Sequence, residues 1–491
     1  MTSTKRDCRR RVRPVSALPE HGVPAGEVLA ELRAMRSGDL PTHGGRLFAY
    51  VYDPGLAGLD ELAAAAHAMS AHVNGLDPTA FPSLLAMEND LVGAAAQVLG
   101  GDEHTVGSVT GGGTESLILA VKAARDGRPD VTAPRLVMPV TAHAALAKAA
   151  AYLRVALDTV PVDPVTLRVD PAAVAAAITP ETVLVACSAP SYAHGLIDPV
   201  EPIAAAAAAA GVRCHVDACF GGWTLPYLRR LGEPVPPFDL SVPGVTSISV
   251  DLHKYAYAPK GVSVLLHRDE RLRASQYFGY ADWPGYTMVN PVISSTRSGG
   301  PIAAAWATLR HIGDDGYLAL AAKTRDATAA IAGAVSKIQD LHVVPRESTV
   351  VAFMSSAVDL FVLADELAAR GWHTQPQFRH GEIPASVHLT VTAAVAPRVA
   401  EFEADLAASV AAAREHGPVE LPPGILDLLG AAAAESVGVE QLAGALGLGE
   451  GGALPERMAV VNSLLDAADP AVREKLLVAF LSLLQRPSRR P

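Results

Sequence analysis

Between about residues 105 and 270, short apolar runs alternate with alanine-rich stretches of helical periodicity. The apolar runs are RLVMPV, VLVACS, RCHVDA, TSISVD and VSVLLH. Strands that alternate with helices indicate crossover connections and a mainly parallel sheet with helices on both faces. The pattern therefore predicts an α/β fold, in which ligands lie beyond the carboxyl ends of the strands.

The segments around this region differ from it in pattern. Helical periodicity precedes it over residues 58–73 and 83–98 and follows it from about 300 to 340. We predict an N-terminal segment at 1–75, a large domain at 76–320, a small α+β domain at 321–416 and a helical C-terminal extension at 417–491. Within the extension, GLGEGGALP is interpreted as a loop.

Charge and composition argue against several classes of function. The net charge of -11 argues against nucleic acid as the main partner, and the basic cluster of Arg9, Arg10, Arg11 and Arg13 is interpreted as a disordered tail. Because no apolar run resembles a signal peptide or a membrane span, we expect no membrane anchor and a cytoplasmic location. No metal site is expected. The cysteines are interpreted as buried thiols rather than metal ligands, and they are Cys8, Cys187, Cys214 and Cys219.

A glycine-rich turn opens one of the helices in the alternating region. In SVTGGGTESLILAVKAARD, residues 108–126, three glycines lead directly into an amphipathic helix. Backbone N–H groups at such a helix N-terminus attract phosphate. The stretch has neither the Lys-Ser/Thr of a nucleotide P-loop nor the GxGxxG spacing, and by itself it also fits a flexible helix start.

Asp217 and Lys254 each follow an apolar strand pattern. Separately, they could be a turn-capping carboxylate and an ordinary surface charge. Together with the glycine turn they meet the needs of pyridoxal phosphate, whose phosphate, ring nitrogen and aldehyde require a helix end, a carboxylate and a Schiff-base lysine. His143, which follows RLVMPV, could stack on the ring or cap a helix.

At these residues the chain resembles the sphingosine-1-phosphate lyase-like proteins of the group II pyridoxal-phosphate decarboxylase superfamily, which have fold type I. The matching stretches are TGGGTES, AHAA, CSAPSYAHGLIDPV, HVDACFGGW, PFDLSVPGVTSISVDLHKYAYAPKG, DWPG, STRSGG and AAWATLRHIGDDGY. The resemblance implies a transferase-like large domain with a mainly parallel sheet of the seven-stranded type and a smaller α+β C-terminal domain. It also implies a homodimer with its active site at the interface.

The resemblance further implies roles for single residues. Lys254 would carry the Schiff base, Asp217 would pair with the ring nitrogen, and His143 would stack on the ring. Tyr52 and Lys260 would lie on the substrate side. The residues expected around the phosphate are Gly112, Gly113 and Thr114, with His253 close by and Gly299 or Gly300 reaching in from a neighbouring subunit.

Two departures from the family pattern concern the substrate. NGLDPTAFPS keeps Asn74 but places Asp77 where the lyases usually have a histidine near the substrate phosphate. A carboxylate there repels a phosphate by roughly 1 to 4 kcal/mol at about 4 Å. In DWPGYTMVNP, Met288 takes the place of the usual tyrosine, and Tyr286 comes earlier. Whether the amine substrate carries a phosphate therefore stays open.

The expected reaction is a retro-aldol cleavage of an amino alcohol or β-hydroxy amine, in which Tyr52 or Lys260 takes the hydroxyl proton. One alternative is an amino-acid decarboxylase, for which Arg297 could bind the α-carboxylate or form a structural ion pair. A biosynthetic carbon–carbon bond formation and a cofactor-binding scaffold without turnover are further alternatives. Release of carbon dioxide rather than aldehyde distinguishes the decarboxylase from the lyase.

Overall fold

The computed structural model describes residues 18–19, 21–286, 288–421, 424 and 456–485. The predicted GLGEGGALP loop, the basic cluster at 9–13 and Cys8 lie outside these residues. By its internal contacts the chain forms two compact units. The first comprises residues 43–355 and 372–406, and the second the described parts of 1–42, 356–371 and 407–491. The division into four parts made from the sequence stays a prediction.

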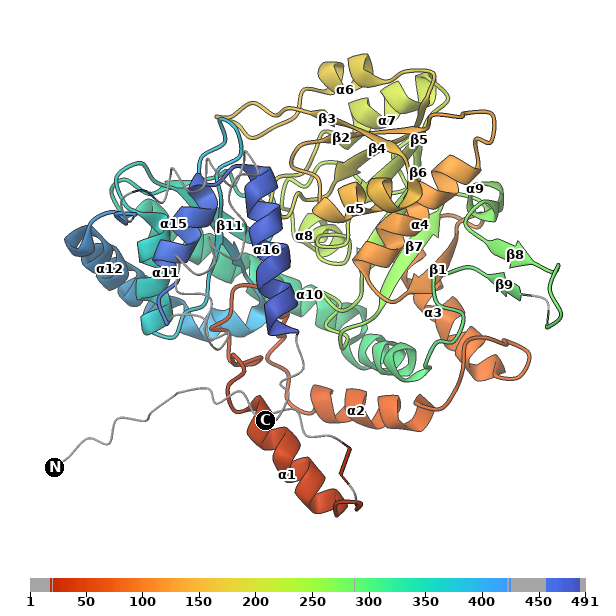
Figure 1. The fold of residues 1–491 in the computed structure, drawn as a ribbon, viewed down its shortest axis with the longest axis horizontal. Coiled ribbons are helices and arrows are strands. Elements are labelled where there is room, and N and C mark those ends of the chain that lie inside the picture. The colour runs from red at the N-terminus through yellow and green to blue at the C-terminus, as the bar shows by residue number, and fades with distance from the viewer. Residues whose placement is uncertain (1–17, 20, 287, 422–423, 425–455, 486–491) are drawn as a thin grey trace. The chain divides into compact units, whose positions relative to one another are not determined.

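A seven-stranded sheet forms the centre of the first unit, in the order β1-β7-β6-β5-β4-β2-β3 (Figure 1). All its neighbouring pairs are parallel except those of β7, which runs antiparallel to β1 and to β6. The predicted mainly parallel sheet is thus confirmed. Its strands are β1 Val106–Thr110, β2 Arg135–Pro139, β3 Ala156–Val160, β4 Thr182–Ser188, β5 Arg213–Asp217, β6 Val245–Asp251 and β7 Ser263–His267.

Helices cover both faces of this sheet because alternate strand residues are apolar on both sides. In β2, Leu136 packs in the cluster that contains residues of α4 and α5, whereas Val137 packs in the cluster with residues of α6 and α7. The helices of the unit are α2 Leu59–Ser70, α3 Pro82–Val98, α4 Gly113–Asp126, α5 Ala144–Leu153, α6 Pro171–Ala177, α7 Val200–Ala209, α8 Leu225–Arg230, α9 Glu270–Ala274 and α10 Gly300–Ser336.

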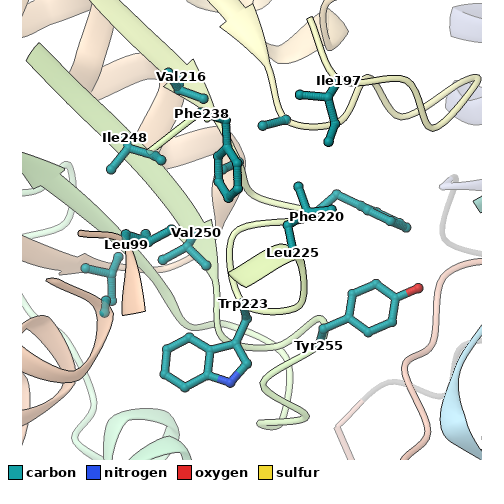
Figure 2. Packing of buried hydrophobic residues seen from close by; sticks show 14 of the residues in the cluster. Leu99, Ile197, Val216, Phe220, Trp223, Leu225, Phe238, Ile248, Val250 and Tyr255 are labelled. Carbon is teal, nitrogen blue, oxygen red and sulfur yellow. The ribbon is translucent and has the colours of Figure 1, made fainter. Parts of the chain in front are cut away.

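The larger hydrophobic core continues to the ends of the strands. Figure 2 shows Phe238 beside Val216 of β5 and Ile248 of β6, together with the rings of Phe220 and Tyr255, which follow the same two strands. All five side chains are buried. The loops that leave β5 and β6 are therefore held by aromatic packing, which gives polar residues on them fixed positions.

A smaller antiparallel sheet completes the first unit, in the order β10-β11-β13-β12. It corresponds to the predicted α+β segment. A two-stranded hairpin, β8 with β9, lies between the large sheet and α10 in the sequence. The remaining elements of this unit are β8 Phe278–Tyr280, β9 Met288–Asn290, β10 His342–Val343, β11 Val350–Met354, β12 Gln375–Gln377, β13 Ser386–Thr390 and the 3₁₀ helix Ala393–Arg398.

The second unit is helical in its described part, as predicted for the end of the chain. Asp365 accepts hydrogen bonds from the N–H groups of Met458 and Ala459, both at 2.9 Å, and so fixes the start of α15. Its helices are α1 Ala25–Arg36, α11 Leu360–Ala369, the later part of α12 Val399–His416, α15 Ala459–Ala467 and α16 Pro470–Leu484. Within the described ranges, every helix is too short or too polar to cross a lipid bilayer.

Candidate active site

A cavity of about 630 Å³ opens where β4, β5 and β6 end and α4 begins. This is the edge at which open α/β sheets bind ligands. The structure brings together here the predicted residues Gly112, Gly113, Thr114, His143, Asp217, His253 and Lys254.

Lys254 is the one lysine among the described residues that line the cavity. It follows β6 by three residues, and its Nζ lies 3.0 Å from Oδ2 of Asp251, the last residue of that strand. Burial disfavours the charge of Lys254, but Asp251, Cys219 and Asp217 outweigh this effect and raise its pKa. Lys254 is thus held as an ammonium group that faces the cavity.

Asp217 ends β5 and is only 7% exposed. Its Oδ1 accepts a hydrogen bond of 3.1 Å from the N–H of Cys219, which fixes the side chain at the cavity wall. Asp217 therefore caps the turn, as considered from the sequence, and also lines the cavity.

The glycine turn brings the N-terminus of α4 to the cavity. Gly112 has φ +155°, a value that side chains rarely allow. A Cβ atom at Gly113 would lie 2.8 Å from Sγ of Cys219 and 2.9 Å from both carboxylate oxygens of Asp251. Only glycine at 113 leaves room for this close approach, and the free N–H groups of the first helical turn form a ready anion site.

Gly113→Ala tests this close packing. The added methyl group must displace Cys219 or Asp251, so we expect a loss of about 1 to 3 kcal/mol in the free energy of unfolding and about tenfold weaker cofactor binding. Thermal unfolding and cofactor titration measure the two effects. Gly333→Ala is the matched control, because Gly333 is helical and a Cβ there meets nothing within 4 Å. Equal behaviour of the two variants would contradict the packing argument.

The two predicted histidines border the cavity on different elements. His143 precedes α5, and its Nδ1 accepts a hydrogen bond of 3.1 Å from the N–H of Ala145, so this residue both caps a helix and lines the cavity. His253 donates from Nδ1 to the carbonyl oxygen of Val262 at 2.8 Å. Its Nε2 lies 3.5 Å from Asp251. Burial lowers the pKa of His253, although Asp251 opposes the change.

Tyr52 and Lys260 lie next to each other near the cavity. Nζ of Lys260 is 5.0 Å from the ring centre of Tyr52, whose ring packs edge-on against Phe220 of the cavity wall at 6.0 Å. Burial raises the pKa of Tyr52 well above its ordinary value. Burial together with the charge of Lys254 lowers the pKa of Lys260 to about 8.

The predicted substrate residues Asn74, Asp77 and Arg297 are not among the residues that line this cavity. Asp77 and Arg297 line a second cavity of about 710 Å³, and Oδ1 of Asn74 accepts a hydrogen bond of 3.3 Å from the N–H of Arg297. Oδ1 of Asp77 accepts hydrogen bonds from the N–H and hydroxyl groups of Thr79, and these bonds lower its pKa. Arg297 forms an ion pair with Glu88, which matches the structural alternative considered for it.

Gly299 and Gly300, expected to reach a neighbouring subunit, begin α10 and pack closely on α2 of the same chain. A Cβ at Gly299 would lie 3.0 Å from the carbonyl oxygen of Ser70, and one at Gly300 would lie 2.7 Å from His67. This contact between helices accounts for both glycines within one subunit. Their predicted contribution across a dimer interface stays a prediction.

Among the cavity residues that were missed from the sequence are Asp251, Ser188 and Tyr192. A signal existed for Asp251, since it ends an apolar strand three residues before Lys254. Ser188 ends β4 and pairs in register with Asp217 of β5, so its place depends on the order of the strands. The hydroxyl of Tyr192 donates to Oε1 of Gln375 at 2.6 Å, and its ring stacks on His388.

The wall fits a phosphorylated pyridine aldehyde. Oγ of Ser188 and Oδ1 of Asp251 are buried without a hydrogen-bond partner among the described residues, so two polar atoms at the cavity remain available to a ligand. The helix end suits a phosphate, Asp217 suits a protonated ring nitrogen, and Lys254 suits an aldehyde. The free thiol of Cys219 also lines the cavity.

Comparisons with known proteins show the family of the chain. The profile of the family described as "Pyridoxal-dependent decarboxylase conserved domain" matches residues 42–355, and a second, "Pyridoxal-dependent enzyme, C-terminal putative HTH domain", matches residues 423–483. The sphingosine-1-phosphate lyase of Arabidopsis thaliana is 38% identical over 74% of this chain and 68% of that protein. The lyase of Dictyostelium discoideum is 39% identical over 70% of this chain and 64% of that protein. The chain thus spans about two thirds of these relatives.

Solved structures show the same likeness. The sphingosine-1-phosphate lyase of Burkholderia pseudomallei is 34% identical, with a TM-score of 0.79 over 90% of this chain and 98% of that one. The glutamate decarboxylase of Lactobacillus brevis superposes with a TM-score of 0.73 over 83% of this chain and 96% of that one at 19% identity, which shows a shared fold.

Proposed function

The chain belongs to the pyridoxal-dependent decarboxylase family and is a pyridoxal-phosphate-dependent lyase, and from this premise we propose that it cleaves the carbon–carbon bond of a phosphorylated amino alcohol. The relatives named sphingosine-1-phosphate lyases support this class of substrate. The observation that carries the proposal is one cavity in which Lys254, Asp251, Asp217 and the start of α4 meet.

When bound, pyridoxal phosphate draws electrons from a bond at the carbon that bears the substrate amine. The N–H groups of Gly112, Gly113 and Thr114 would hold its phosphate. Lys254 would hold its aldehyde carbon, and Asp217 would keep its ring nitrogen protonated. These assignments rest on the positions of the side chains around the cavity.

Asp251 contributes to this site through Lys254. Its Oδ2 lies 3.0 Å from Nζ, and burial, which raises the pKa of Asp251, is outweighed by Lys254 and His253, which lower it. The buried carboxylate therefore stabilises the ammonium form of Lys254 whenever the substrate amine frees it. Lys254 can then deliver a proton to the carbon from which the bond was broken.

Lys260 is our candidate for the base that takes the hydroxyl proton, rather than Tyr52. With its raised pKa, Tyr52 keeps its proton at neutral pH and is therefore a poor base. Lys260, with a pKa of about 8, is partly neutral at that pH and can accept a proton. Its Nζ also lies 3.4 Å from the carbonyl oxygen of His253, beside the cavity.

Turnover should therefore rise with pH and level off above about pH 8, as Lys260 loses its proton. In Lys260→Gln we expect this rise to disappear and kcat to fall about 100-fold, which steady-state rates between pH 6 and 9 measure. Lys148→Gln, an exposed change on α5, is the control. A variant at position 260 that keeps the wild-type rise would assign the base to another residue.

The reaction itself is tested by offering sphingosine-1-phosphate, its non-phosphorylated counterpart and a panel of amino acids to the cofactor-loaded protein. We expect aldehyde from the phosphorylated amino alcohol and no carbon dioxide from the amino acids. The ion pair between Arg297 and Glu88 favours the lyase, because a decarboxylase would need Arg297 to bind the α-carboxylate of its substrate and Glu88 already neutralises it. Carbon dioxide release without aldehyde would replace the proposal by a decarboxylase.

A homodimer in the cytoplasm is part of the same proposal. The three described cysteines, Cys187, Cys214 and Cys219, are free and buried, which suits a reducing compartment. Sedimentation of the purified, cofactor-loaded chain measures the oligomeric state. A monomer with full turnover would remove the dimer from the proposal.

A further inference from the structure

The loop at residues 189–197 joins β4 to the segment before α7, and two residues close its base. Oδ2 of Asp198 accepts a hydrogen bond of 2.7 Å from the N–H of Ser188. The N–H of Asp198 donates to the carbonyl oxygen of Ser188 at 3.0 Å. Both bonds join the main chain of Ser188 to Asp198, one through the carboxylate of Asp198 and one through its N–H.

This loop forms part of the cofactor-facing wall. Ser188, Pro190 and Tyr192 all line the cavity of about 630 Å³. Tyr192 is fixed at its far side, because its hydroxyl donates to Gln375 and its ring lies 4.5 Å from that of His388. The wall is therefore held at two places, at Tyr192 within the loop and at the base of the loop, which Asp198 closes.

Asp198 is also linked to Asp217. Ser188, which donates its N–H to Asp198, pairs in register with Asp217. The N–H of the next residue, Ala189, donates to the carbonyl oxygen of Asp217 at 2.9 Å. Asp198 is 6% exposed and Asp217 is 7% exposed, so little water screens one carboxyl from the other. A change of charge at Asp198 therefore changes the electrostatic potential at Asp217.

We propose that Asp198 is a positioning residue of the cofactor site: its carboxyl closes the base of the 189–197 loop, and its charge strengthens the negative field at Asp217. The inference rests on the proposed function only in that the cavity takes pyridoxal phosphate. It does not depend on which substrate is cleaved.

The residues around Asp198 place the change of its charge near neutral pH. Burial raises its pKa to about 7; the N–H of Ser188 and the guanidinium of Arg168 oppose the rise, and Asp217 and Glu347 add to it. Glu347 forms an ion pair with Arg168 and accepts a hydrogen bond of 2.9 Å from the N–H of Ile197. Because the folded pKa is above the unfolded one, the stability that Asp198 contributes is present below about pH 4 and is lost as pH rises through about 7.

Asp198→Asn and Asp198→Ala separate the two parts of the proposal in the cofactor-loaded, full-length protein. The amide resembles the protonated carboxyl in shape and charge, so the Asn variant should release cofactor at the wild-type rate below pH 6. Above pH 8 the wild type should release it about three- to tenfold more slowly than this variant, since the N–H of Ser188 bonds more strongly to an ionised acceptor, even though burial of that charge lowers the stability of the whole fold. Asp198→Ala, which opens the base of the loop, should release cofactor about tenfold faster at every pH.

Release is followed by the visible absorbance of the bound cofactor after dilution into a scavenging amine. Infrared difference spectra between wild type and Asp198→Asn give a second measurement, in which a buried carboxylic acid band should disappear with a midpoint near pH 7. Glu347→Gln should move this midpoint to lower pH and Arg168→Gln to higher pH. These two shifts test the electrostatic surroundings of Asp198, whereas the cofactor release rates test its positioning role.

An Asn variant that matches the wild type at every pH would overturn the effect of charge. An Ala variant that keeps the wild-type release rate would overturn the positioning role, and if the Ala variant does not fold, the Asn variant and the infrared band decide alone. Release rates and the infrared band do not depend on turnover. Failure to cleave amino alcohol phosphates would therefore refute the proposed function and leave this inference standing.

Discussion

Replacing Lys254 by alanine should abolish both the visible absorbance of the bound cofactor and turnover, with a loss of about 1,000-fold or more in kcat. Lys254 is the one lysine among the described residues that line the cavity, whereas Lys260 lies beside the cavity and does not line it. The change also removes the cation 3.0 Å from the buried Asp251, which we expect to cost about 3 to 5 kcal/mol in the free energy of unfolding.

Lys254→Arg separates these two effects. A guanidinium keeps the positive charge beside Asp251 but does not bond to an aldehyde, so this variant should regain stability and remain inactive. Lys148→Ala, on the exposed side of α5, should behave as the wild type. Absorbance, borohydride trapping followed by peptide mapping, and thermal unfolding measure the three properties. Trapping of the cofactor at a position other than 254 would refute our assignment.

Replacing Asp217 by asparagine should lower kcat by about 100- to 1,000-fold while the protein stays folded and coloured. The amide oxygen can still accept the hydrogen bond from the N–H of Cys219, so the turn after β5 keeps its shape. What is lost is the negative charge, without which a ring nitrogen loses its proton more readily and the cofactor withdraws electrons less strongly.

The absorbance spectrum and kcat of this variant are read together. Asp217→Glu is the charge-matched partner and should recover part of the rate, because it restores the carboxylate at a slightly different position. Ser249→Ala, at the register partner of Asp217 in β6, controls for packing around the strand ends. If Asp217→Asn turned over at more than about a third of the wild-type rate, the ring nitrogen would need another partner.

Much of the site could be predicted because its residues sit next to strong local patterns. Asp217 and Lys254 each follow an apolar strand, and Gly112 and Gly113 precede an amphipathic helix, so the α/β pattern alone places them at one edge of the sheet. The antiparallel pairing of β7 with β1 was not predictable in this way. It depends on how distant strands pair, which no local periodicity encodes.

The residues that the sequence did not reveal act through long-range contacts. Asp198 reads as an ordinary loop carboxylate, and only burial beside Ser188, Arg168 and Glu347 gives it an unusual pKa. Arg297 reads as a possible substrate ligand, and only the packing of α3 against its segment shows the ion pair with Glu88.

By itself the sequence determined the α/β class and the cofactor, and it singled out Lys254, Asp217 and the glycine turn as candidates for the site, because those features are properties of short stretches that keep their form in any such fold. The tertiary structure alone decided which charges lie together and which are buried. It placed Asp251 against Lys254, lowered the pKa of Lys260 and set Asp77 and Arg297 at a second cavity. The physical reason is that electrostatic energies depend on the distance between charges and on the exclusion of water, and both quantities are set by the tertiary structure rather than by short stretches of sequence.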